Sequence, residues 1–162
     1  MNGKLLMQRL LEDISLSLNV WYSKERMEWD ILFAIIITAV SYRSTCARVK
    51  QSALLVEDNR IISIGYNGAA AGQTHCIDQG DKSDASGSCL YCVHAEHNCL
   101  GYAARNGIKT DGCTIYVTMT PCINCSKLIV ASGIKEYKYL SEYRLKEGKD
   151  FLLSNNVKVT KL

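Results

Sequence analysis

The sequence lacks a long hydrophobic run. Its most apolar stretch is the ten residues Ile31–Val40, whereas a membrane-spanning helix needs about 20 apolar residues. The stretch also follows acidic residues and lies too far from the N-terminus to be a secretory signal peptide. We expect Ile31–Val40 to be a buried helix, and we expect no membrane association. Because no targeting segment is visible, we also expect a cytoplasmic protein, or one of the host cytoplasm if a virus encodes it.

A strong charge of one sign is also lacking. The 19 Lys and Arg residues and the 16 Asp and Glu residues are interspersed, and the net charge is only +3. A protein that depends on duplex DNA or RNA usually carries a denser basic surface. We therefore expect a small anionic partner rather than stably bound nucleic acid.

Repeats are absent, and 162 residues with 48% apolar side chains suit one domain with one core. After an apolar hairpin, helix and strand patterns alternate, which favours an α/β fold whose later strands are mostly parallel. We predict a single-domain three-layer sandwich with a central mixed sheet of about five strands, to which residues 1–25 add an N-terminal helix. The helices are predicted at 1–20, 29–42, 95–106, 123–131 and 145–153, and the strands at 52–57, 61–66, 113–118, 137–140 and 157–160.

A stretch rich in Gly, Ser and Asp interrupts this alternation at residues 67–93. An irregular segment of this length inside a compact domain is normally functional or tied to something. The chain has eight cysteines, which in a reducing compartment are thiols or metal ligands rather than disulfides. We therefore expect this loop to be functional or to be tied down by something.

Two short motifs carry chemistry, and each stands where the chain enters a predicted helix. The first is HAE, which contains His94 and Glu96, and the second is PCINC, which contains Cys122 and Cys125. Together they have the H-x-E and P-C-x-x-C pattern of zinc deaminases. The two cysteines are three residues apart, so both sulfurs can face one metal, and a helix N-terminus favours their thiolates. With His94 they leave one tetrahedral position for water, while Glu96 is the candidate catalytic acid and base.

The cysteines also allow a different interpretation. Cys89 and Cys92 form a second C-x-x-C pair, and two such pairs resemble a zinc ribbon, a binding module with one closed four-cysteine site. That interpretation leaves His94 and Glu96 without a role, so we favour the enzyme.

At these motifs the sequence resembles the cytidine and deoxycytidylate deaminase family, over residues 27–143. RSTC at Arg43–Cys46 and GYNG at Gly65–Gly68, followed by Gly72, resemble the deoxycytidylate branch in particular. The resemblance implies Zn²⁺-dependent hydrolysis of dCMP to dUMP and ammonia, which supplies dUMP for thymidylate synthesis. In that reaction Glu96 would take a proton from water and pass protons to the ring nitrogen N3 and to the leaving amino group. A tRNA adenosine deaminase and a free cytidine deaminase are the alternative enzymes.

The resemblance further implies a second, structural zinc ion. Cys46 and Cys76 would join Cys89 and Cys92 around it, with His75 as an alternative ligand. Four thiolates make a closed tetrahedral site, which would order the long loop. Some of these cysteines could instead be buried thiols.

Four residues are candidates for contacts with the substrate. Asn67 can donate and accept hydrogen bonds at a sugar or base, although a role as a turn residue is an equal alternative. Thr120 precedes the metal-binding helix, Arg43 could bind the phosphate, and Tyr143 could lie beside the nucleotide.

Regulation is implied by the resemblance as well, with dCTP activating and dTTP inhibiting, bound with Mg²⁺, in a homohexamer. A glycine-rich loop lets backbone N–H groups approach phosphates, and Tyr102 and Arg105 share one helix face. Arg105 could instead be a solvated charge at a helix end. The candidate effector residues are Gly65, Tyr66, Gly68, Gly72, Tyr102 and Arg105.

Overall fold

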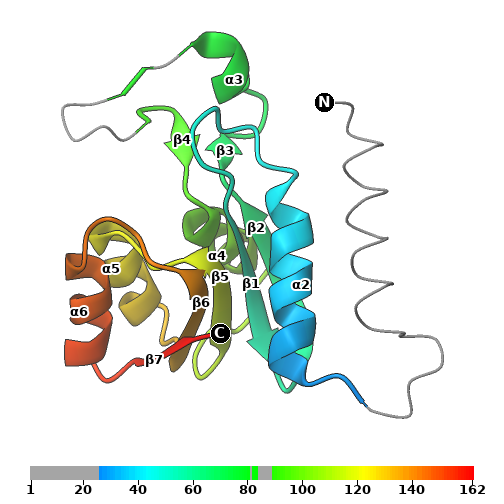
Figure 1. Cartoon of the computed structure of the whole chain (residues 1–162), viewed down its shortest axis with the longest axis vertical. Coiled ribbons are helices and arrows are strands. Elements are labelled where there is room, and N and C mark those ends of the chain that lie inside the picture. Colours follow the sequence, from blue (N-terminus) through cyan, green and yellow to red (C-terminus); the bar gives the residue numbers. More distant parts are fainter. Residues whose placement is uncertain (1–25, 81, 84–88) are drawn as a thin grey trace.

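The computed structural model describes residues 26–80, 82–83 and 89–162. The helix predicted within residues 1–25 therefore lies outside the described residues. A five-stranded sheet of order β2-β1-β5-β6-β7 forms the centre of the protein (Figure 1). Its strands are β1 (Ser52–Glu57), β2 (Arg60–Tyr66), β5 (Thr114–Met119), β6 (Glu136–Ser141) and β7 (Lys158–Lys161), and the helices against it are α2 (Trp29–Ser41), α4 (Ala95–Arg105), α5 (Ile123–Ala131) and α6 (Glu147–Ser154).

The strand connections place the starts of two helices at one edge of the sheet. β1 and β2 form the predicted hairpin, in which Asp58 and Asn59 have φ angles of 47° and 60°, a conformation that Asp and Asn tolerate better than most residues. β1 also pairs antiparallel with β5, whereas β5, β6 and β7 are parallel. α5 and α6 connect these parallel strands, and ligand sites of such sheets lie beyond the carboxyl ends of the strands.

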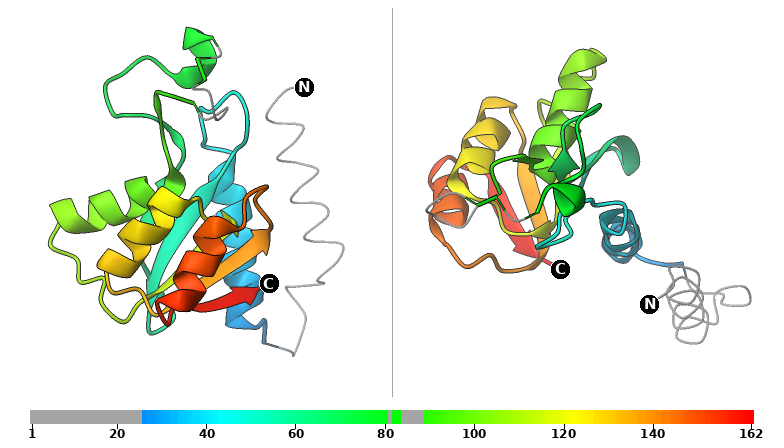
Figure 2. Two further views of the ribbon diagram at one scale, coloured as in Figure 1. Left: turned by 90° about the vertical axis from the view of Figure 1, so that its left-hand side faces the viewer. Right: turned by 90° about the horizontal axis from the view of Figure 1, so that it is seen from above.

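Helices cover both faces of the sheet, because β1 presents apolar side chains to both faces. Leu54 and Val56 pack with Phe33 and Ile37 of α2 on one face. The larger core lies on the other face, where α4, α5 and α6 pack (Figure 2). This confirms the predicted three-layer α/β fold with a mixed five-stranded sheet. Within the described ranges, no helix combines the length and the apolar character that a membrane span requires.

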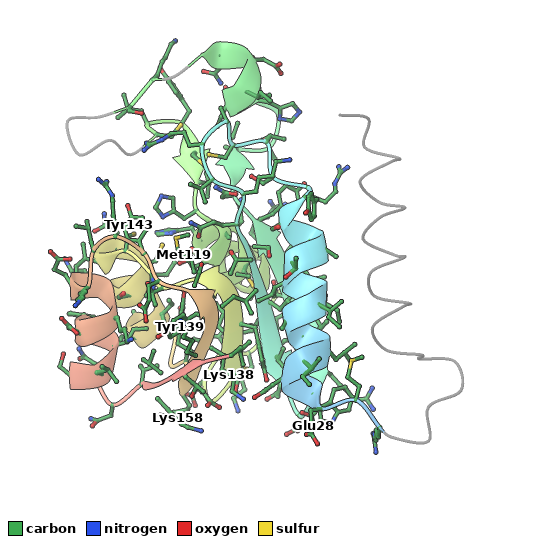
Figure 3. All side chains as sticks on the ribbon, in the orientation of Figure 1. Glu28, Met119, Lys138, Tyr139, Tyr143 and Lys158 are labelled. Carbon is green, nitrogen blue, oxygen red and sulfur yellow. The ribbon has the colours of Figure 1, made fainter. Side chains whose placement is uncertain are left out.

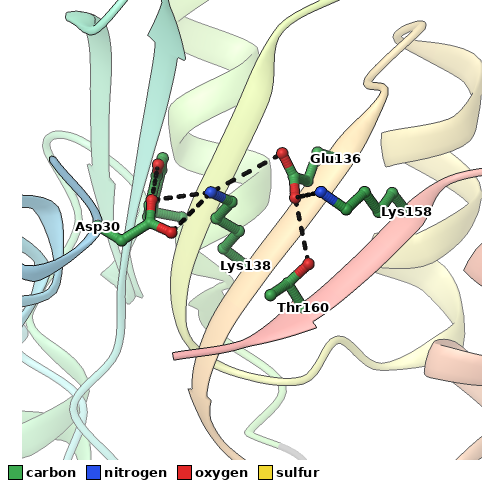
Figure 4. A network of polar contacts seen from close by, with 6 residues as sticks. Asp30, Glu136, Lys138, Lys158 and Thr160 are labelled. Atoms are coloured by element: carbon green, nitrogen blue, oxygen red, sulfur yellow. Dashed lines mark hydrogen bonds and ion pairs between the residues drawn. The ribbon is translucent and has the colours of Figure 1, made fainter. Parts of the chain in front are cut away.

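A polar network holds α2 against the sheet (Figure 4). Asp30, in the first turn of α2, accepts hydrogen bonds from the Tyr116 hydroxyl at 2.6 Å and from Lys138 Nζ at 2.8 and 2.9 Å. Next to it, Glu136 of β6 pairs with Lys158 of β7 at 2.8 Å. Polar groups therefore fix the position of a helix whose sequence is almost entirely apolar.

The described parts of residues 67–93 contain regular elements that their composition does not predict. β3 (Gly68–Ala69) and β4 (Cys92–Val93) pair antiparallel, and α3 (Cys76–Gln79) lies between them in the chain. Strands of two residues and a helix of one turn have too little periodicity for a sequence pattern to reveal them. The β3–β4 pair leads directly into α4 and lies beyond one end of the central sheet (Figure 1).

Candidate active site

His94, Cys122 and Cys125 come together where the chain enters α4 and α5. His94 immediately precedes α4, and Cys122 immediately precedes α5, whose first turn contains Cys125. His94 Nδ1 lies 3.3 Å from Cys125 Sγ and 3.6 Å from Cys122 Sγ. Among groups of three or more His, Cys, Asp or Glu side chains in the part of the chain that the structure describes, this is the one group whose ligand atoms all lie within 4.8 Å of one another. One imidazole and two thiols suit zinc.

The two thiols of this group shift each other's pKa in opposite directions. A hydrogen bond with Cys125, together with one to His94, lowers the pKa of Cys122 to about 3, although burial opposes the shift. The same pairing with Cys122, and then burial, raises the pKa of Cys125. A divalent cation that binds both sulfurs would displace any proton on them, because metal ligation requires thiolates.

Glu96 lies beside this group, in the first turn of α4, and is only 3% exposed. Burial raises the pKa of its carboxyl above the usual range. Glu96 lines the same pocket as His94 and Cys122. A carboxyl in such a poorly solvated position can serve as a general acid and base.

The pocket has a volume of about 190 Å³ and opens at the edge of the sheet from which α5 starts. Figure 3 shows Met119 and Tyr143 towards this end of the central sheet and Lys158 towards its other end. The predicted substrate residues Asn67, Thr120 and Tyr143 line the pocket. Arg43 does not, because the chain is still in the turn that closes α2, where the Arg43 N–H bonds to the Val40 carbonyl at 2.9 Å.

Two arginines that the sequence analysis missed line the pocket in place of Arg43. Arg48 comes from the segment before β1, and Arg144 follows Tyr143 after β6. The Arg144 guanidinium lies 5.6 Å from the Tyr143 ring centroid. Both arginines belong to segments without regular structure, so no periodic pattern could have identified them.

The side chains of Asn67 and Thr120 are engaged with the protein. Asn67 Oδ1 accepts hydrogen bonds from Ser44 Oγ at 2.6 Å and from the Gln51 N–H at 2.8 Å, and its Nδ2 donates to the Val49 carbonyl at 2.7 Å. Thr120 Oγ1 accepts from the Tyr143 N–H at 2.6 Å. Both residues therefore shape the pocket by fixing the segments around it.

A second, looser cluster consists of Cys46, Cys76, Cys89 and Cys92. Their thiols influence one another, but in the described part of the chain no three of them have sulfurs that all lie within 4.8 Å of one another. Burial, followed by its neighbours Cys89 and Cys46, raises the pKa of Cys76, and burial together with Cys46 raises the pKa of Cys92. His75 is exposed in front of α3. The two C-x-x-C pairs thus belong to different clusters, which is not the arrangement of a zinc ribbon.

The candidate effector residues do not gather in one described pocket. A Cβ at Gly65 would lie 2.9 Å from Cys99 Cα and closer still to the Ala95 carbonyl oxygen, and a Cβ at Gly68 would lie 2.5 Å from Thr45 Oγ1. Close packing therefore accounts for glycine at both positions. By contrast, Gly72 is in open space with a φ of +82°, and Tyr66, Tyr102 and Arg105 are exposed.

Known proteins resemble this chain over most of its length. A sequence profile of the cytidine and deoxycytidylate deaminase zinc-binding region matches residues 27–141. The deoxycytidylate deaminase of Mycobacterium phage D29 is 42% identical over 127 residues, covering 72% of this chain and 98% of the phage protein. ComE operon protein 2 of Bacillus subtilis is 40% identical over 120 residues, and this chain spans only 63% of its length.

A solved structure shares the fold. The dCMP deaminase of cyanophage S-TIM5, crystallised in complex with dCMP and dUMP, is 33% identical and has a TM-score of 0.73, covering 85% of this chain and 100% of that one. The profile match spans both metal motifs and the strands and helices that carry them. The chain belongs to the cytidine and deoxycytidylate deaminase family.

Proposed function

We propose that the protein hydrolyses dCMP to dUMP and ammonia, and so supplies dUMP for thymidylate synthesis in the cytoplasm. The observation that carries this proposal is the buried carboxyl of Glu96, which shares one pocket with the metal-ligand candidates His94 and Cys122. Two proteins that the chain resembles, from phage D29 and cyanophage S-TIM5, are deoxycytidylate deaminases, and the S-TIM5 structure contains dCMP and dUMP.

The residues of the site have separate tasks in this reaction. His94, Cys122 and Cys125 would hold Zn²⁺, which when bound lowers the pKa of a water molecule towards neutrality. Glu96 would take a proton from the attacking water and deliver it to N3 of cytosine, which makes C4 more electrophilic, and the remaining hydroxide would add to C4. The same carboxyl would then take the proton of this new hydroxyl group and pass it to the amino group, so that the C4–N bond breaks, ammonia leaves and the oxygen on C4 becomes the carbonyl of dUMP. Because Glu96 is buried, bulk water competes little for these protons.

Arg48 and Arg144 are our candidates for binding the 5′-phosphate. Both line the pocket, and a guanidinium can bind phosphate with two charge-assisted hydrogen bonds. Tyr143, whose ring lies under Arg144, would pack beside the nucleotide. Replacing either arginine with Ala should raise KM for dCMP more than it lowers kcat, whereas Arg43→Ala, outside the pocket, is the matched control.

The proposal includes a second, structural Zn²⁺ ion at Cys46, Cys76, Cys89 and Cys92. Its support is the mutual interaction of these thiols and the fact that a closed set of four cysteines is the structural type of zinc site. The exposure of His75 favours the four thiols over a set that includes this imidazole.

The proposal also includes regulation by dCTP and dTTP with Mg²⁺, in a homohexamer. Tyr102 and Arg105 are exposed at the end of α4, where they could reach a bound triphosphate. The test is the velocity curve for dCMP with and without dCTP, in the wild type and in Arg105→Glu. A hyperbolic wild-type curve that neither dCTP nor dTTP changes would refute the proposed regulation, but it would not contradict the proposed deamination of dCMP.

Ammonia release from four compounds tests the main proposal: dCMP, dCTP, cytidine and a tRNA anticodon stem. We expect turnover of dCMP above all others, in a sample in which zinc is counted. Turnover of the tRNA stem alone would identify an adenosine deaminase, and turnover of cytidine alone a nucleoside deaminase. A zinc-loaded protein that deaminates none of them would be a binding module.

A further inference from the structure

His97 contacts the metal-ligand group from a position that the reaction does not use. It lies in the first turn of α4, three residues after His94, which immediately precedes the helix. His97 Nδ1 lies 3.3 Å from Cys125 Sγ. The two imidazole rings meet edge to face, with centroids 6.1 Å apart and an interplanar angle of 87°.

Cys125 needs a hydrogen-bond donor when it is a thiolate. Its side chain is fully buried, and a buried anion without a donor is costly. His94 cannot be that donor in the metal-bound protein, because its Nδ1 lies close to both sulfurs and is the atom placed to ligate. A ligating nitrogen carries no proton and cannot donate. In the described part of the chain, His97 Nδ1 is the other imidazole nitrogen that lies 3.3 Å from Cys125 Sγ.

We propose that His97 is a positioning residue that donates its Nδ1–H to the Cys125 thiolate and so holds this sulfur as a zinc ligand. The proposal rests on the proposed metal centre. A thiolate can only accept, so the hydrogen bond fixes the proton of His97 on Nδ1. His97 is absent from the lining of the substrate pocket, and it therefore acts on the reaction only through Cys125.

Zinc affinity tests the proposal in two His97 variants and one control. His97→Phe keeps a ring of similar shape and removes the donor, while His97→Asn keeps a donor near the position of Nδ1. In competition with a chromogenic chelator, we expect His97→Phe to bind zinc about 10–100-fold more weakly and His97→Asn to stay close to the wild type. The matched control is Asn98→Ala, which removes a neighbouring side chain that donates to the Tyr66 carbonyl at 2.6 Å.

Cobalt-substituted protein supplies a readout that loss of stability alone does not change. Removing a hydrogen bond from a ligating thiolate raises the energy of its lone pairs. We therefore expect the thiolate-to-Co²⁺ charge-transfer band to move to longer wavelength in His97→Phe, and to stay in place in His97→Asn and Asn98→Ala. Wild-type affinity and band position in His97→Phe would overturn the proposal, as would a His97→Asn variant as weak as His97→Phe.

A measurement on the wild type keeps the proposal testable if His97→Phe does not fold. In the zinc-loaded protein, ¹⁵N NMR of the imidazoles should show a proton on Nδ1 of His97, and a proton on Nε2 alone would overturn the proposal. Cys125→Ser separates the two proposals. Full zinc retention in Cys125→Ser would refute the metal centre itself, whereas zinc loss there with no effect of His97→Phe would refute only the role of His97.

Discussion

At the scale of single residues, Glu96 offers the most direct test of the chemistry. Glu96→Gln keeps the size of the side chain and removes the proton shuttle. We expect kcat for dCMP to fall by at least about 10²-fold, while zinc content and thermal stability stay near those of the wild type, because the carboxyl is not a ligand. Steady-state kinetics with metal analysis of the same sample check this, and near-normal turnover in Glu96→Gln would refute the mechanism.

Gly65 is a second residue whose role can be measured. A Cβ at this position would be pressed against backbone atoms of Ala95 and Cys99 on α4, so Gly65→Ala forces β2 and α4 apart. We expect a loss of about 1–3 kcal/mol in the free energy of unfolding. We also expect lower activity, since α4 carries Glu96. Urea denaturation measures the first effect.

The matched control for that substitution is Gly101→Ala on the same helix. A Cβ at Gly101 meets no atom within 4 Å, and Ala is favoured over Gly inside a helix by roughly 0.5–1 kcal/mol. Gly101→Ala should therefore stabilise the protein. Equal stability of Gly65→Ala and Gly101→Ala would show that the close approach at Gly65 is not a constraint.

At the scale of elements, Asp30 is the polar link between α2 and the sheet. Burial raises the pKa of its carboxyl, but the hydrogen bonds from Lys138 and Tyr116 outweigh burial, and the net shift is below the ordinary value of 3.8. A lowered folded-state pKa stabilises the fold above the unfolded-state value, and this contribution disappears as the pH falls through the folded-state pKa. The Asp30 side chain is 43% exposed, so the contribution is only about 1 kcal/mol or less.

We therefore expect Asp30→Asn to lower the free energy of unfolding at pH 7 and to approach wild-type stability below pH 3.8. Urea denaturation across this pH range measures the difference between the two proteins. A difference that stays constant, or grows as the pH falls, would show that Asp30 does not act through its charge.

The elements were also the most predictable level of the fold. β1, β5 and the helices that cover the sheet have long apolar patterns, and their bounds fall within two residues of the prediction. The β3–β4 pair and α3 could not be predicted, since their pairing depends on contacts between residues far apart in the chain. The segment 1–25 carries a helical pattern in the sequence, and that prediction stays open.

The site was predictable where chemistry demands a residue type at a fixed spacing. His94, Glu96, Cys122 and Cys125 stand in such motifs. Arg48 and Arg144 reach the pocket from irregular segments, and only the folded chain brings His97 to Cys125. Spacing therefore identifies candidate ligands and a candidate proton shuttle, whereas the residues proposed to bind the phosphate or to support a ligand are found only in the tertiary structure.

At the scale of the whole molecule, the two cysteine clusters predict two zinc ions per chain. Cys89→Ser should remove one ion and lower the melting temperature before it abolishes catalysis, because that metal orders the loop. Cys122→Ser should remove the other ion together with the activity. Cys113→Ala is the control, since Cys113 is a buried cysteine that belongs to neither group of candidate ligands. Metal analysis counts the zinc ions per chain, and calorimetry measures the melting temperature. The prediction would be contradicted if the folded wild type held a single zinc ion and Cys122→Ser removed it.

The contact between α6 and the start of α5, the helix that contains Cys125, determines which truncated genes we expect to encode an active protein. Gly148 of α6 lies so close to the start of α5 that a Cβ there would be 2.8 Å from the Cys122 carbonyl carbon, and Ser126 donates to the Gly148 carbonyl at 2.8 Å. A nonsense codon just after Leu145 would leave residues 27–141, and every motif within them, in the translated product. It would nevertheless remove the helix that supports Cys122. Such an allele would retain the complete family profile and encode an inactive enzyme, so an intact reading frame through α6 is the better criterion for a working gene.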